Sequence, residues 1–99
     1  MAEIRWTSEA LNWLSKIHEY IAINNPSAAQ KTVQGIFDKV QILSQFTRLG
    51  HRYEGIHDRE VRIFYYGHYR IAYLIVTEEI IDILGVFHGA MEIDKYLLR

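Results

Sequence analysis

The chain has 99 residues, the length of one small domain, and 49% of them are hydrophobic, which excludes the disordered class of proteins. A formal net charge of −1 argues against a protein held to nucleic acid mainly by its global charge. The absence of cysteine excludes disulfides, iron–sulfur clusters and thiolate zinc sites, and the longest apolar run, residues 71–76, is far shorter than the roughly 20 residues of a membrane span.

The first part of the chain carries two stretches with apolar residues at helical spacing. Thr7 or Ser8 can cap the start of the first helix. Asn24, Asn25 and Pro26 are expected to end this helix and to start the second, because proline suits the first turn of a helix. A hairpin of two amphipathic helices is therefore predicted, and its apolar face needs a partner surface. The apolar positions are Ala10, Trp13, Leu14, Ile17, Tyr20 and Ile21, followed by Ala29, Val33, Ile36, Phe37, Val40 and Leu43.

The second half of the chain supplies that surface as predicted strands. Residues 60–66, 69–76 and 80–88 are rich in β-branched and aromatic side chains and are separated by short turns, which predicts an antiparallel meander. Residues 3–6 form a candidate fourth strand. The prediction is one α+β domain over residues 1–99, with the N-terminal helical hairpin packed on one face of a three- to four-stranded antiparallel sheet.

The sheet face opposite the hairpin is the candidate docking surface. Both alternating sets of side chains along residues 69–76 are largely apolar, and the set away from the hairpin contains Leu74 and Val76 beside Arg70. Two helices cover only one face, so these residues are predicted to bind a partner. The alternative is that a terminal helix around residues 93–98 covers this face.

Short motifs follow one another in a characteristic order along nearly the whole chain. They are Trp6 before a helix, Tyr20-Ile21-Ala22, Asn25-Pro26-Ser27-Ala28-Ala29, Arg59-Glu60-Val61, Tyr69-Arg70-Ile71 with Tyr73, and Val86-Phe87-His88-Gly89. In this order they resemble the RelE/ParE superfamily of toxins from bacterial type II toxin–antitoxin systems. The resemblance is nearer to its ParE-like, or plasmid stabilisation, branch.

This resemblance implies a cytoplasmic toxin that is neutralised by a cognate antitoxin. ParE-like members bind DNA gyrase and trap its cleaved complex without a catalytic site, whereas RelE-like members are nucleases that cut mRNA on the ribosome. The ParE-like function is favoured because residues 61–66 carry one cation and residues 89–92 carry no arginine, where RelE-like nucleases are richer in basic residues. A degenerate, non-toxic member is the third alternative. A homodimer and a toxin–antitoxin hetero-oligomer both remain open.

If the chain is a nuclease, the resemblance implies a set of four catalytic residues, Arg70, Arg62, His88 and Tyr96. Arginines would stabilise the extra charge on the phosphate, and a histidine would act as acid or base. The plainer alternatives are a salt bridge for Arg70, an ordinary strand residue for Arg62, a hydrogen-bonded turn histidine and a packed tyrosine.

If the chain binds a protein, Arg62, Arg70, Leu74 and Val76 are the predicted contacts. No metal site is predicted, because three loop histidines with two nearby acids bind a metal only if the fold happens to bring them together. No cofactor is expected.

Overall fold

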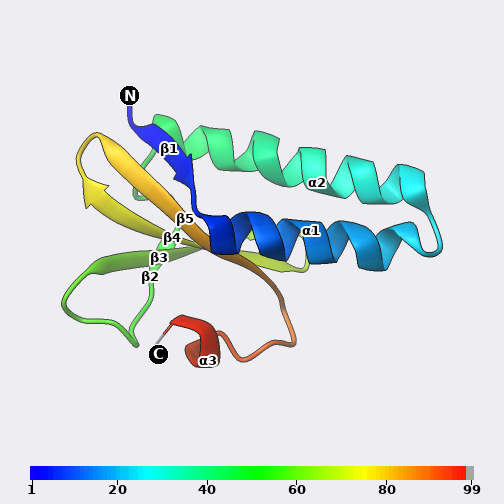
Figure 1. The fold of residues 1–99 in the computed structure, drawn as a ribbon. Helices are drawn as coiled ribbons and strands as arrows, with labels where there is room; N and C mark the ends of the chain where they lie inside the picture. Colours follow the sequence, from blue (N-terminus) through cyan, green and yellow to red (C-terminus); the bar gives the residue numbers. More distant parts are fainter. Residues whose placement is uncertain (98–99) are drawn as a thin grey trace.

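The computed structural model describes residues 1–97 as a helical hairpin, a five-stranded sheet and a short C-terminal helix (Figure 1). The hairpin lies along one face of the sheet, and the C-terminal helix lies on the opposite side. Within the described residues no helix combines the length and the apolar character needed to cross a membrane. The elements are β1 (Glu3–Trp6), α1 (Ser8–Ala22), α2 (Pro26–Gln41), the 3-10 helix η1 (Ile42–Ser44), β2 (His51–Arg52), β3 (Glu60–Tyr66), β4 (Tyr69–Thr77), β5 (Ile80–His88) and α3 (Asp94–Leu97).

Both helix starts are fixed by side-chain caps at the predicted positions. The Thr7 hydroxyl accepts the backbone N–H of Ala10 at 3.1 Å and donates to the carbonyl of Ile83 at 2.7 Å, which ties the start of α1 to β5. The Asn25 side chain accepts the N–H of Ala28 at 3.0 Å, and Pro26 is the first residue of α2. Each cap satisfies a helix N–H that has no partner within its helix.

The sheet has the strand order β1-β5-β4-β3-β2. The predicted meander of β3, β4 and β5 is confirmed, and Gly67, with φ +56°, provides the left-handed turn between β3 and β4. The prediction differs from the structure in two respects. β1 joins the sheet parallel to β5, with Glu3 opposite Ile80, and β2 adds a fifth strand of only two residues.

The α+β class is confirmed, with the hairpin packed on one sheet face. At the centre of β4, Ile71, Ala72 and Tyr73 are completely buried, and successive side chains of a strand point to opposite faces. β4 is therefore covered on both sides. The cluster between helices and sheet includes Leu14, Ile36, Val40, Leu43, Phe64, Ile71, Tyr73, Ile81, Ile83 and Val86.

The second sheet face is covered over part of its area. Ile93, which precedes α3, packs with Ile63, Ala72 and Phe87 in a separate cluster. Val76, farther along β4, remains 43% exposed. The chain's own C-terminal segment therefore covers one part of this face and leaves another part open, and partner binding at the open part stays a prediction. Leu98, the last residue of the predicted terminal helix, lies outside the described residues.

The buried Tyr73 hydroxyl generates a stability prediction. It accepts the N–H of Gly50 at 3.0 Å and donates to the carbonyl of Thr47 at 2.8 Å, so it fastens the loop after η1 to the core. Tyr73→Phe leaves both backbone groups without this partner, and we expect the free energy of unfolding to fall by about 1–3 kcal/mol in denaturant titration. Tyr65→Phe, at a residue 51% exposed, is the control and should change it by less than about 0.5 kcal/mol. Equal effects of the two variants would contradict this role for Tyr73.

Candidate functional site

The sheet register separates the predicted site residues onto two faces. Directly paired residues of an antiparallel ladder point to the same face. Arg70 is paired with Tyr65 and Phe87, whose side chains lie on the face away from the hairpin. Arg62 is paired with Tyr73, and His88 with Tyr69, on the hairpin face. Arg62 and Arg70 therefore do not form one basic patch.

Arg70 holds the turn that follows β5. Its Nη2 donates to the carbonyl of Gly89 at 3.2 Å and to the carbonyl of Met91, while its Nε is buried without a hydrogen-bond partner. The side chain is half-buried. Because backbone carbonyls occupy this part of the guanidinium, Arg70 positions the chain between β5 and α3 as well as presenting a cation to the second face.

Arg62 belongs to a network that supports the loop before β2. Its Nε contacts Oε2 of Glu60 at 2.8 Å, and its Nη1 donates to the carbonyl of Gly50 at 2.6 Å. Arg48 contacts the same Glu60 oxygen from Nε at 3.0 Å. The Arg62 side chain is only 18% exposed. The hydrogen bond from Arg62 is the largest cause of the lowered pKa of Glu60, and Arg48 adds to it against the opposing effect of burial.

His88 and Tyr96 lie in different surroundings. His88 is exposed at the end of β5, where its Nδ1 accepts the N–H of Ala90 at 3.3 Å. Tyr96 packs edge-on against Trp13, with ring centroids 5.0 Å apart, and is stacked on Phe87 at 5.5 Å. Tyr96 therefore packs in an aromatic cluster. Among residues 1–97, no three or more His, Cys, Asp or Glu side chains lie together so that they could hold a metal ion.

Leu74 and Val76 form an open strip on the second face. Val76 is 43% exposed and Leu74 is partly exposed. Leu74 is paired with Asp82 of β5, whose carboxylate contacts Nε of Arg5 at 2.6 Å. The strip is thus apolar, and its neighbouring acid is paired with an arginine.

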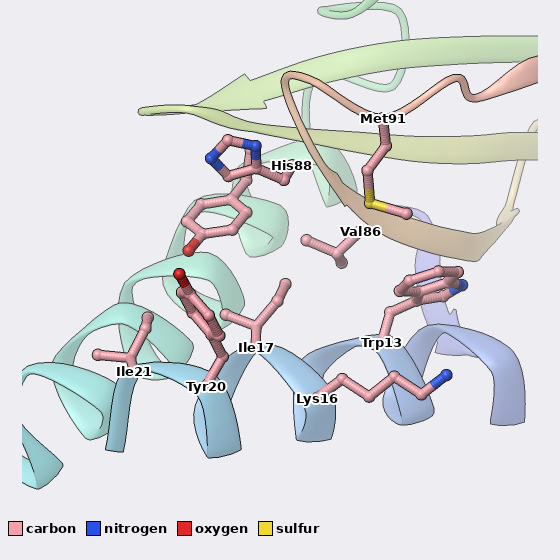
Figure 2. A pocket seen from close by; sticks show the side chains of 9 residues that line it. Trp13, Lys16, Ile17, Tyr20, Ile21, Val86, His88 and Met91 are labelled. Atoms are coloured by element: carbon pink, nitrogen blue, oxygen red, sulfur yellow. The ribbon is translucent and has the colours of Figure 1, made fainter. Parts of the chain in front are cut away.

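A cleft between α1 and the end of β5 was missed by the reasoning from sequence. Figure 2 shows Ile17 of α1 facing Val86 of β5, with Ile21 one turn farther along α1 and with Met91 from the turn after β5 on the opposite side. The volume of this α1–β5 cleft is about 400 Å³. The cleft residues of α1 follow the same helical spacing as its core residues. The sequence therefore contains no signal that distinguishes a cleft residue from a core residue.

Removal of the Arg70 side chain should loosen the segment that it holds. In Arg70→Ala we expect amide hydrogen exchange at Tyr96 and Leu97, which donate to the Ile93 carbonyl, to rise about tenfold because the preceding turn loses two charge-assisted bonds. Amides at the centre of β4 should stay protected. Arg52→Ala, at an exposed arginine of β2, is the control. Unchanged exchange in residues 89–97 would contradict this positioning role.

The Glu60 network predicts a loss of stability in acid. A carboxylate whose pKa is lower in the folded than in the unfolded state stabilises the fold above the unfolded value, and this contribution disappears as the pH falls through the folded value. The Tm of the wild type should therefore fall more between pH 7 and pH 3 than the Tm of Glu60→Gln. Glu54→Gln, at an exposed loop acid, should follow the wild type. Parallel curves for all three proteins would show that Glu60 carries no such contribution.

Comparison with known proteins gives two positive findings. Residues 4–93 match the family model described as the ParE toxin of the type II toxin–antitoxin system parDE. A solved structure described as the chromosomal ParDE TA system from P. aeruginosa contains a chain 25% identical to this one, with a TM-score of 0.72 over 89% of this chain and 96% of that chain. A search of curated protein sequences found no match. Since the family model spans most of its length, the chain belongs to the ParE toxin family of type II toxin–antitoxin systems.

Proposed function

We propose that this toxin acts in the cytoplasm in the ParE-like manner, by binding DNA gyrase, and that a cognate antitoxin neutralises it. The observation that carries the proposal is the separation of the four candidate nuclease residues. Arg70 lies on one sheet face, whereas Arg62 and His88 belong to the other. A composite nuclease site would bring them to one phosphate.

The chemistry of RNA cleavage explains why this separation weighs against a nuclease. Attack by a 2′-hydroxyl needs a base at that hydroxyl, a cation at the phosphate and an acid at the leaving oxygen, all within hydrogen-bond reach of one substrate. Here Arg62 is paired with Glu60, and Tyr96 is packed between Trp13 and Phe87. These contacts support a toxin that acts through surface complementarity.

The open strip favours a protein target. Leu74 and Val76 present apolar surface next to a neutralised pair, Arg5 and Asp82. Such a surface suits the apolar centre of a protein interface better than it suits a phosphate backbone. A net charge of −1 also gives little attraction to the ribosome's RNA. We assign Leu74 and Val76 to target contact and Arg70 to the shape of the adjoining turn, while Arg62 supports the loop near Gly50.

The function is tested with purified toxin and gyrase. We expect supercoiling to fall with toxin concentration while cleaved DNA accumulates, and we expect messages in a translating extract to stay intact. Codon-positioned cuts in those messages would establish the nuclease alternative instead. Expression without antitoxin that leaves growth unaffected would identify a degenerate member.

The contact surface is tested by a charge placed in the open strip. Val76→Glu should raise the toxin concentration needed to inhibit gyrase by about tenfold or more, because a carboxylate would lose its water in an apolar contact. Gln30→Glu makes the same change of charge at an exposed position of α2 and should inhibit like the wild type. Unaltered inhibition by Val76→Glu would exclude the strip from the gyrase contact.

A further inference from the structure

The α1–β5 cleft exists because the helical hairpin projects beyond the sheet. Figure 1 shows α1 and α2 continuing past the last residues of the strands toward the hairpin's own turn. Tyr20 and Ile23, near the end of α1, are 77% and 79% exposed. The apolar stripe of α1 thus runs from the covered core into open surface, and the cleft lies at this transition. Apolar residues exposed together in this way mark interaction sites on soluble proteins.

The polar side chains of the cleft include several hydrogen-bond donors and one cation, Lys16, and none of them is a carboxylate. Figure 2 places His88 and Tyr20 toward one end of the cleft and Trp13 and Lys16 toward the other. The ammonium group of Lys16 lies 5.0 Å from the centroid of the Trp13 ring. Burial, with a smaller effect of Tyr20, raises the pKa of Tyr69, so this phenol remains a protonated donor.

Acidic side chains of the described residues do not line the cleft. Glu19, next to Tyr20 in sequence, lines the separate groove between α1 and α2. Glu92, which follows Met91, contacts Nζ of Lys95 at 3.4 Å. No carboxylate of residues 1–97 lines the cleft, so the ammonium group of Lys16 has no acidic partner there. The cleft therefore combines apolar walls with a positive rim that a carboxylate would complement.

We propose that the α1–β5 cleft receives an apolar side chain of the cognate antitoxin together with a neighbouring carboxylate. The apolar group packs between Ile17, Ile21 and Val86, and the carboxylate pairs with Lys16. A volume of about 400 Å³ is sufficient for one or two side chains. This inference rests on the proposed function, because it takes the antitoxin as the partner.

Three small probes test the apolar contact and the contact with the carboxylate separately. N-acetyl-L-leucine carries both groups, N-acetyl-L-leucinamide lacks the charge, and N-acetylglycine lacks the side chain. Their binding is followed by NMR at the indole N–H of Trp13, with the indole of Trp6, packed against Phe37, as an internal control. We expect N-acetyl-L-leucine to shift the Trp13 signal and to bind about two- to five-fold more tightly than the amide. N-acetylglycine should bind most weakly.

Lys16→Gln should reduce the affinity for N-acetyl-L-leucine to that for the amide. Lys31→Gln removes the same charge from an exposed position on α2 and should leave the preference for the acid intact. Equal binding of acid and amide to the wild type would overturn the role of charge. Absence of a Trp13 shift with all three probes would overturn the cleft as a binding site.

The identity of the occupant is tested with the cognate antitoxin, once the reading frame that encodes it has been identified. The affinity of the antitoxin for Lys16→Glu should fall at least tenfold, because two negative charges would then face each other, whereas Lys31→Glu should bind like the wild type. Equal affinities of the two variants would show that the antitoxin docks elsewhere. Since complex formation is measured directly, a toxin that fails to inhibit gyrase would refute the proposed target and leave this result unaffected.

Discussion

Burial of β4 on both faces is the constraint on which the rest of the structure depends. The central residues Ile71, Ala72 and Tyr73 are fully buried, so each face of this strand must be covered by another part of the chain. The helical hairpin covers one face, and the segment that leads into α3 covers the other. Arg70 precedes these residues and bonds the carbonyls of Gly89 and Met91, so it attaches the second cover to the strand that needs it.

This constraint also decides how the charges of the sheet are used. An arginine beside a buried strand must satisfy its donors close by, and Arg62 does so with Glu60 and the Gly50 carbonyl. Arg70 does so in part, because its Nη2 bonds the turn after β5 while its Nε has no partner. Arg62 and Arg70 are thus engaged within the fold, whereas Arg52 of β2 is exposed. The recognition surfaces that we propose are the places where apolar residues extend beyond their cover.

Much of the fold was predictable because helix caps and tight turns depend only on residues that are close together in the sequence. Thr7 and the Asn25-Pro26 pair cap helices through neighbours three residues away, and Gly67 permits its turn without help from distant residues. β1 was predicted as a strand, but alternation with period 2 carries no information about direction, so its parallel pairing with β5 was not. β2 has only two residues, too few to show any period. Its pairing depends on the loop that Tyr73 fastens at Gly50.

The site was harder to predict than the fold, because its residues depend on which face of the sheet each one occupies. The sequence presents Arg62 and Arg70 alike, as cations on strands, and only the register of β3 against β4 reveals that they point to opposite faces of the sheet. The acceptors of Arg70 are backbone carbonyls, which every residue carries, so no side-chain type in the sequence indicates them.

The α1–β5 cleft could not be predicted from the sequence for a similar reason, because it depends on where α1 lies relative to the sheet. Ile17 packs against the core and also lines the cleft, whereas Ile21, one turn farther along the same stripe, lines the cleft without packing against the core cluster. What distinguishes core from cleft is the place where the sheet ends beneath α1, and that place is set by the lengths of β4 and β5. Beyond the end of the sheet, the residues of this stripe are as apolar as core residues, but no strand covers them. A partner that supplies the missing cover therefore continues the packing that the sheet begins.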